Sequence, residues 1–169
     1  MSQRVKTALL LINQRSRKGR IDATRATQLL QQSGFTLLQP DPDDSRSYTE
    51  LIIAYAHRVE LVIVGGGDGT LNAAASGLLL TGLPLGILPL GTANDFARTL
   101  GIPPQLEQAV SIISQGHTRF VDLGEVNDHL FLNVSSIGFS AELARNLTAQ
   151  AKKRWGVLGY AFAALRILR

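Results

Sequence analysis

The stretch VIVGGGDGTLNAAA, residues 62 to 75, places four glycines, one aspartate and one threonine directly behind a short apolar run. A glycine-rich turn between a buried strand and a helix presents backbone N–H groups and the positive end of the helix, and phosphate commonly binds there. Phosphate is an anion, however, and a carboxylate beside it is repulsive unless a cation or a proton donor intervenes. The presence of Asp68 in this loop therefore points to Mg²⁺ or to a substrate hydroxyl.

Two common nucleotide-binding patterns do not fit this loop. The pattern G-x-x-x-x-G-K-[ST] is absent because no lysine follows the glycines. The dinucleotide pattern G-x-G-x-x-G begins at Gly65 and Gly67, but Thr70 occupies the position of its third glycine. We expect the glycines to let the backbone approach the ligand closely, and Thr70 to cap the helix or to bond a phosphate oxygen.

A second loop of the same kind follows the next apolar run. Residues 84–88 read as a strand, and PLGTAND at 89–95 then combines glycine, threonine, asparagine and aspartate before another helical segment. Ligands of open parallel sheets bind at the carboxyl ends of the strands, so two such loops on neighbouring strands would face one crevice. Metal and hydroxyl partners both belong to phosphoryl transfer, and Asp68 is therefore better explained by a kinase than by a passive phosphate binder.

Apolar runs alternate with helical patterns up to residue 115. We expect strands at 8–12, 35–38, 60–64 and 84–88, and helices at 22–33, 48–57, 71–80, 96–100 and 106–114. Asp22 is expected to cap the first helix, and residues 13–20 are expected to form a polar loop. Such repeated βαβ units predict an α/β fold, a parallel sheet in a three-layer nucleotide-binding domain.

The pattern changes after residue 118. The runs on either side of Asn127 and Asp128 look like the two strands of a hairpin, and residues 152–169 read as an apolar helix. We therefore predict a nucleotide-binding domain over residues 1–120. Residues 121–169 would begin a β-rich second domain that is incomplete here.

The composition of the chain narrows its function. Hydrophobic residues make up 45% and charged residues 18%, which suits a folded core, and there is no cysteine for a disulfide or a thiolate metal site. The net charge is +4, and the basic stretches are not interleaved with aromatic residues, so we expect no nucleic-acid partner. The excess of basic residues suits anionic phosphate or an anionic membrane surface at least as well as nucleic acid. Prolines and glycines interrupt the longest apolar stretch, which is therefore not a membrane span.

At its two loops the sequence resembles the diacylglycerol kinase catalytic-domain superfamily, which includes the bacterial YegS-like lipid kinases and the sphingosine kinases. The resemblance rests on GGGDGTLN at 65–72 and LGILPLGTANDFAR at 85–98. It implies a cytoplasmic enzyme at the membrane periphery that uses ATP and Mg²⁺ to phosphorylate a lipid hydroxyl. A homodimer is one assembly that it leaves open.

The resemblance also implies a set of site residues. Asp68 would be the catalytic residue, as the base or as the ligand of the metal. The residues expected to bind the nucleotide are Asn13, Gly66, Gly67, Asp68, Gly69, Thr70, Leu71, Asn72, Thr92, Asn94 and Asp95. The sequence departs from the family at Ala73, where a glutamate is frequent, and at residues 13–20, where a loop with proline and glycine is usual.

Three alternatives remain at this point. An NAD kinase-like enzyme shares the first loop, although GTANDFAR at 91–98 argues against it. A nucleotide-binding module or fragment without catalysis would account for Ala73 and for the incomplete second domain. The polar residues of the loops can also have simple structural roles, with Asn94 or Asp95 as a helix cap and Asn13 as a loop cap.

Overall fold

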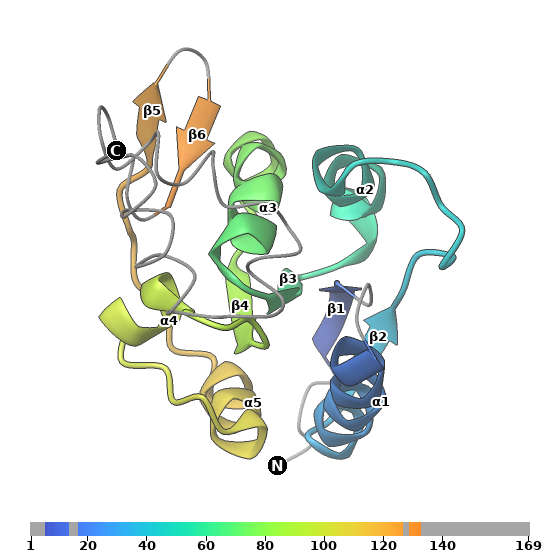
Figure 1. Cartoon of the computed structure of the whole chain (residues 1–169). Helices are drawn as coiled ribbons and strands as arrows, with labels where there is room; N and C mark the ends of the chain where they lie inside the picture. The colour runs from blue at the N-terminus through green and yellow to red at the C-terminus, as the bar shows by residue number, and fades with distance from the viewer. Residues whose placement is uncertain (1–5, 14–16, 127–128, 133–169) are drawn as a thin grey trace, which may run out of the picture. The chain divides into compact units, whose positions relative to one another are not determined.

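The fold is taken from a computed structural model that describes residues 6–13, 17–126 and 129–132 (Figure 1). All of these residues belong to one compact unit, which spans residues 1–133. The predicted helix at 152–169 and the later part of the predicted hairpin lie outside the described residues. The predicted division into two domains stays a prediction.

Four parallel strands form the central sheet, in the order β2-β1-β3-β4. The strands are β1 (Lys6–Ile12), β2 (Phe35–Leu38), β3 (Leu61–Gly66) and β4 (Leu85–Pro89). In the register of the sheet, Ile12 lies opposite Gly65, and Gly66 lies opposite Pro89. Strands β1, β3 and β4 therefore end close together, and the loops behind β3 and β4 leave the same edge.

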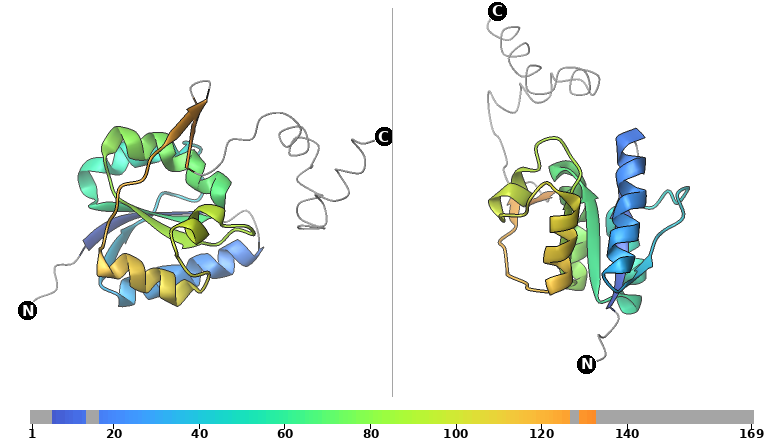
Figure 2. Two further views of the ribbon diagram at one scale, coloured as in Figure 1. Left: turned by 90° about the vertical axis from the view of Figure 1, so that its left-hand side faces the viewer. Right: turned by 90° about the horizontal axis from the view of Figure 1, so that it is seen from below.

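Helices cover both faces of this sheet, as Figure 2 shows. The helices are α1 (Arg17–Gln32), α2 (Tyr48–Tyr55) with the 3₁₀ turn η1 (Ala56–Arg58), α3 (Asp68–Thr81), α4 (Asp95–Thr99) and α5 (Leu106–Gln115). Helices α1 and α5 lie side by side on one face, and α2 and α3 lie side by side on the other. The predicted three-layer α/β fold is confirmed.

Alternate side chains of the buried strands serve the two layers of the core. Leu9 and Leu11 of β1 belong to the cluster beneath α2 and α3, whereas Ala8 and Leu10 belong to the cluster beneath α1 and α5. A strand covered on both faces needs apolar side chains at every position. This is why β1 and β3 read as continuous apolar runs rather than as alternating patterns.

Two predicted helix starts are wrong. Helix α1 begins at Arg17, so residues 17–20 are helical and Asp22 lies inside the helix instead of capping it. Arginine and lysine are good helix formers, and a single glycine weakens a helix only modestly, so this polar stretch can form the first turn of the helix. Helix α3 begins at Asp68, and its N-cap is Gly67, whose backbone is extended. Thr70 is already within the first turn and does not cap it.

The predicted hairpin is present but short. Strand β5 (Gly124–Val126) pairs antiparallel with β6 (His129–Phe131), and β6 packs beside α3. A Cβ atom on Gly124 would lie only 2.1 Å from Cζ of Phe131, so the absence of a side chain allows the ring to cross the strand. In the described part of the chain, no helix has the length and apolar character needed to cross a membrane.

Candidate functional site

The first glycine loop is a direct passage from strand to helix. Gly65 and Gly66 are buried in β3, and Gly67 connects them to α3. The N–H groups of Thr70 and Leu71 donate to the carbonyl oxygen of Gly67 at 2.9 and 3.1 Å. Within the described residues, the preceding N–H groups of residues 67–69 have no acceptor. Unpaired N–H groups at a helix start are an anion-binding feature.

The carboxylate of Asp68 caps a helix other than its own. Its Oδ1 accepts a hydrogen bond from Phe96 N at 2.9 Å, and its Oδ2 accepts one from Asp95 N at 3.1 Å. These two amides are the first of α4, so Asp68 satisfies donors that a helix start leaves unpaired. Two N–H donors thus face the negative charge, which explains how a carboxylate is accommodated within a loop suited to an anion.

The second glycine loop is held by the side chain of Asn94. This residue adopts the left-handed conformation, with a φ of 51°. Its Oδ1 accepts from Gly91 N at 2.9 Å, and its Nδ2 donates to the carbonyl oxygens of Pro89 and Gly91 at 3.2 and 2.9 Å. Asn94 occupies the N-cap position of α4 but makes no side-chain bond to that helix.

Asp95 also does not cap α4, because its carboxylate pairs with Arg98 one turn later. Both residues were candidates for the helix cap, and Asp68 takes that role instead. The side chain of Asp95 is about half exposed, at 49%. The backbone N–H of Asp95 is one of the two that donate to Asp68, so both aspartates belong to the start of α4.

The two loops touch through their backbones. A Cβ atom on Gly91 would lie 2.3 Å from the Cα of Gly67, a distance that no real Cβ contact reaches. A Cβ on Gly67 would lie 3.2 Å from the Cα of Gly91. Glycine is therefore required at Gly91 by the neighbouring loop rather than by its own backbone angles. The loops behind β3 and β4 form one continuous surface at the edge of the sheet.

The remaining predicted residues lie in different surroundings. Asn13 extends β1 beside β3, since its N–H donates to Gly65 O at 3.0 Å. Leu71 is only 1% exposed and packs in the core, so only its backbone can face a ligand. Asn72 accepts a hydrogen bond from Leu132 N at 3.0 Å and thereby ties α3 to the end of the hairpin. Thr92 is exposed on the second loop.

The structure thus brings together the first loop, Asp68, Thr92, Asn94 and Asp95, and it places Leu71 in the core. Sequence reasoning missed Gly91 as the contact between the loops. It also missed that Asp68 and Asn94 hold the second loop in place. The available signal was a glycine at the end of each of two neighbouring strands, since loops that leave one edge together must share space.

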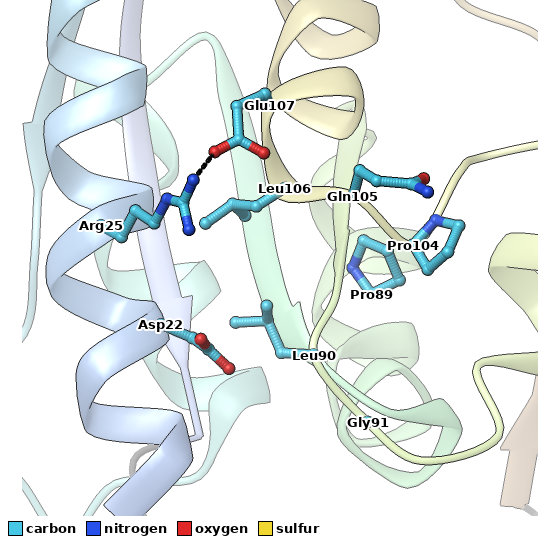
Figure 3. Close-up of a pocket in the computed structure, with 9 residues that line it drawn as sticks. All are labelled: Asp22, Arg25, Pro89, Leu90, Gly91, Pro104, Gln105, Leu106 and Glu107. Carbon is cyan, nitrogen blue, oxygen red and sulfur yellow. Dashed lines mark hydrogen bonds and ion pairs between the residues drawn. The ribbon is translucent and has the colours of Figure 1, made fainter.

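A pocket of about 250 Å³ lies beside the second loop, on the face of the sheet that carries α1 and α5 (Figure 3). Arg25 of α1 and Glu107 of α5 form an ion pair across it, and both side chains are at least about half exposed. The lining residues are Asp22, Arg25, Pro89, Leu90, Gly91, Pro104, Gln105, Leu106 and Glu107. It shares Gly91 with the loop surface, but none of the other predicted site residues line it.

Few metal ligands are present in the described part of the chain. No three acidic, histidine or cysteine side chains cluster there. Asp68 and Asp95 are the carboxylates of the two loops, and Asp68 retains lone pairs besides those that accept the two N–H groups. This donor set suits Mg²⁺, which keeps several waters and is commonly bound through one or two carboxylates together with substrate phosphates.

The chain matches the model of the diacylglycerol kinase catalytic domain over residues 7–126. The chain belongs to this family. The matched segment contains both glycine loops and nearly all of the parallel sheet. The resemblance noted at the two loops is therefore confirmed over most of the described fold.

Individual members of the family are similar over a large part of this chain. Two proteins named "Probable lipid kinase YegS-like" are 39% identical over 162 residues (Yersinia enterocolitica serotype O:8 / biotype 1B) and 42% identical over 124 residues (Pseudomonas savastanoi pv. phaseolicola). The solved structure of a diacylglycerol kinase from Bacillus anthracis str. Sterne is 30% identical, with a TM-score of 0.61 over 79% of this chain. The matches cover 53%, 40% and 52% of those proteins, so the chain spans about half the length of its relatives.

Proposed function

We propose that this chain supplies the nucleotide-binding part of an ATP-dependent lipid kinase that transfers the γ-phosphate of ATP to a lipid hydroxyl. The observation that supports this proposal is the joined pair of loops. In the described part of the chain, N–H groups without an acceptor begin α3, the second loop touches the first through Gly67 and Gly91, and the carboxylate of Asp68 accepts from the amides that follow the second loop. Kinship with proteins named as lipid kinases supports the lipid as the phosphate acceptor.

The residues of the loops would divide the work of phosphoryl transfer. The N–H groups of residues 67–69 and the hydroxyl of Thr92 would bind and orient the phosphates. Asp68 would hold a hydrated Mg²⁺ or accept the proton of the attacking hydroxyl. When bound, Mg²⁺ supplies the positive charge that offsets the phosphate charge and the carboxylate. Positioning and charge compensation are the main needs of this reaction, since little covalent chemistry falls to the protein.

The proposed setting is the cytoplasmic side of a membrane, with the protein bound peripherally. A lipid hydroxyl is presented at the membrane surface, whereas ATP is dissolved, so the enzyme must work at the boundary between them. The excess of basic over acidic residues, which gives a net charge of +4, favours association with anionic lipid.

The test is transfer of labelled phosphate from ATP to mixed lipid vesicles by the full-length gene product with Mg²⁺. We expect the label in the lipid extract for the natural protein and none above background for Asp68→Asn. Asparagine can keep one of the two bonds to α4, but its amide would oppose the other N–H, so the melting temperature must be measured alongside. Asp43→Asn is the matched control, because Asp43 is an exposed acid outside both loops.

Three results would contradict the proposal. Full lipid phosphorylation by a folded Asp68→Asn variant would remove Asp68 from the chemistry. Label that appears in NADP instead of lipid, when NAD is added, would favour the NAD kinase-like alternative. Nucleotide binding without transfer to any lipid would favour a binding module without catalysis.

A further inference from the structure

The side chain of Asn94 has little capacity left for a ligand. An asparagine amide has two N–H donors and one acceptor oxygen. Both donors are used by the carbonyl oxygens of Pro89 and Gly91, and the oxygen accepts from Gly91 N. Ionised phosphate oxygens carry no proton and can only accept hydrogen bonds, so a residue that binds them must offer a donor. Asn94 was expected to bind the nucleotide, but its donors are turned into its own loop.

These bonds close the second loop into a ring. They link residue 94 back to residues 89 and 91, and within this ring residues 91–93 are exposed. At one end of the ring, Gly91 rests on Gly67 of the first loop. At the other end, the amides that follow Asn94 donate to Asp68. The exposed segment is thus held at both ends against the first loop, with Asn94 as the side chain that sets its path.

We propose that Asn94 is a positioning residue that holds Thr92 and the neighbouring N–H groups of the second loop in place for the nucleotide phosphates, without touching the nucleotide itself. The proposal rests on the proposed use of ATP. An exposed loop without such bonds would have to become ordered when phosphate binds, and that loss of freedom weakens binding. The hydrogen bonds of Asn94 would avoid this entropic cost, because they hold the loop in the conformation that binds phosphate before the nucleotide arrives.

The test is a double-mutant cycle on the affinity for MgATP, measured by calorimetry on the full-length gene product. Asn94→Ala is expected to weaken binding about tenfold, which corresponds to 1.4 kcal/mol. If Asn94 acts through Thr92, then Thr92→Val should add almost nothing in the Asn94→Ala background, although it weakens binding in the natural protein. Additive losses would overturn the proposal. Thr36→Val, at an exposed position of β2, is the control for loss of a threonine hydroxyl.

A glycine variant separates the side-chain bonds from the backbone conformation. Glycine adopts positive φ readily, so the melting temperature of Asn94→Gly should be higher than that of Asn94→Ala. The affinity of Asn94→Gly for MgATP should stay about as weak as that of Asn94→Ala, because the ring of hydrogen bonds is missing in both. Full affinity in Asn94→Gly would show that the bonds are dispensable and would overturn the proposal.

The same measurements distinguish this inference from the proposed reaction. Binding of MgATP that follows the expected cycle, without transfer to any lipid, would contradict the lipid kinase reaction and support the role of Asn94. Transfer to lipid together with additive losses of affinity in Asn94→Ala and Thr92→Val would support the lipid kinase reaction and contradict the role of Asn94. Failure of the natural protein to bind MgATP would overturn both.

Discussion

The two glycine loops look alike in sequence, but different forces hold them in shape. In the first loop, glycines in β3 run directly into α3, and the N-cap Gly67 needs no side-chain bond. In the second loop, the side chain of Asn94 makes three hydrogen bonds, and the helix that follows is capped by Asp68 from the first loop. One loop is formed by the backbone itself, and the other is formed by side chains around it.

The length of the following helix explains this difference. Helix α3 has 14 residues and packs into the core through buried residues such as Leu71 and Ala74. Helix α4 has five residues, too few to be stable without tertiary contacts. The first loop can therefore rely on the element behind it. The second loop needs Asn94 and Asp68 to define where its short helix begins.

The strongest way to break the pairing of the loops is Gly91→Ala. The added Cβ would meet the backbone of Gly67 at 2.3 Å, and backbone atoms cannot move aside without displacing β3 or β4. We expect a loss of about 2–3 kcal/mol in the free energy of unfolding, measured by urea denaturation, as for other overpacked sites. Binding of MgATP should weaken as well.

Gly69→Ala is the comparison for this substitution. Nothing lies within 4 Å of a Cβ atom at Gly69, which is in the first turn of α3. Its unfolding free energy should be unchanged or higher by up to about 1 kcal/mol, because alanine restricts the unfolded chain. Equal stability of the two alanine variants would contradict the contact between the loops.

Asp68→Ala should break the link from the first loop to the second at a smaller cost. Two amides of α4 lose their acceptor, and loss of a helix cap typically costs about 1–2 kcal/mol. Amide hydrogen exchange should show faster exchange at Asp95 and Phe96, whereas the amides of Thr70 and Leu71 should stay protected. Unchanged exchange at Asp95 and Phe96 would show that Asp68 does not cap α4.

Asn72→Ala should leave both loops intact and affect the hairpin alone. The lost hydrogen bond from Leu132 N is worth about 1 kcal/mol, and exchange of that amide should become faster. Exchange at Asp95 and Phe96 should not change. If those amides also lost protection, the hairpin and the second loop would be coupled, and the comparison would have to include all three segments.

The smallest effect is expected in a third polar loop, behind β2, where Arg46 and Asp44 form an ion pair. The Arg46 side chain donates hydrogen bonds to Asp44 and lowers the pKa of that carboxyl from 3.8 to about 2. A lowered pKa means that the pair stabilises the fold above pH 4 and that this contribution is lost as the pH falls toward 2. In Arg46→Gln, carboxyl NMR titration should show the pKa of Asp44 returning toward 3.8. A pKa that stays near 2 would assign the shift to another cause.

Much of the fold is predictable from local patterns. The bounds of β2 are as predicted, at residues 35–38, and those of β1, β3, β4 and α5 differ from prediction by at most two residues at either end. Buried strands are recognisable because every position must be apolar when both faces are covered. The start of α1 was not predictable in this way, because residues 17–20 are polar and helix propensity alone does not distinguish a helical turn from a loop.

The candidate site also combines features that local sequence patterns predict with contacts that they do not. The sequence by itself determined that two glycine loops follow neighbouring strands and that Asp68 lies in the first of them, because those features depend on residue types and short spacings. Only the tertiary structure decided what Asp68 and Gly91 contact. Asp68 accepts from amides 27 and 28 residues away, and Gly91 rests on the other loop. Such contacts exist only after β3 and β4 pair, since that pairing brings distant segments of the chain to one edge of the sheet.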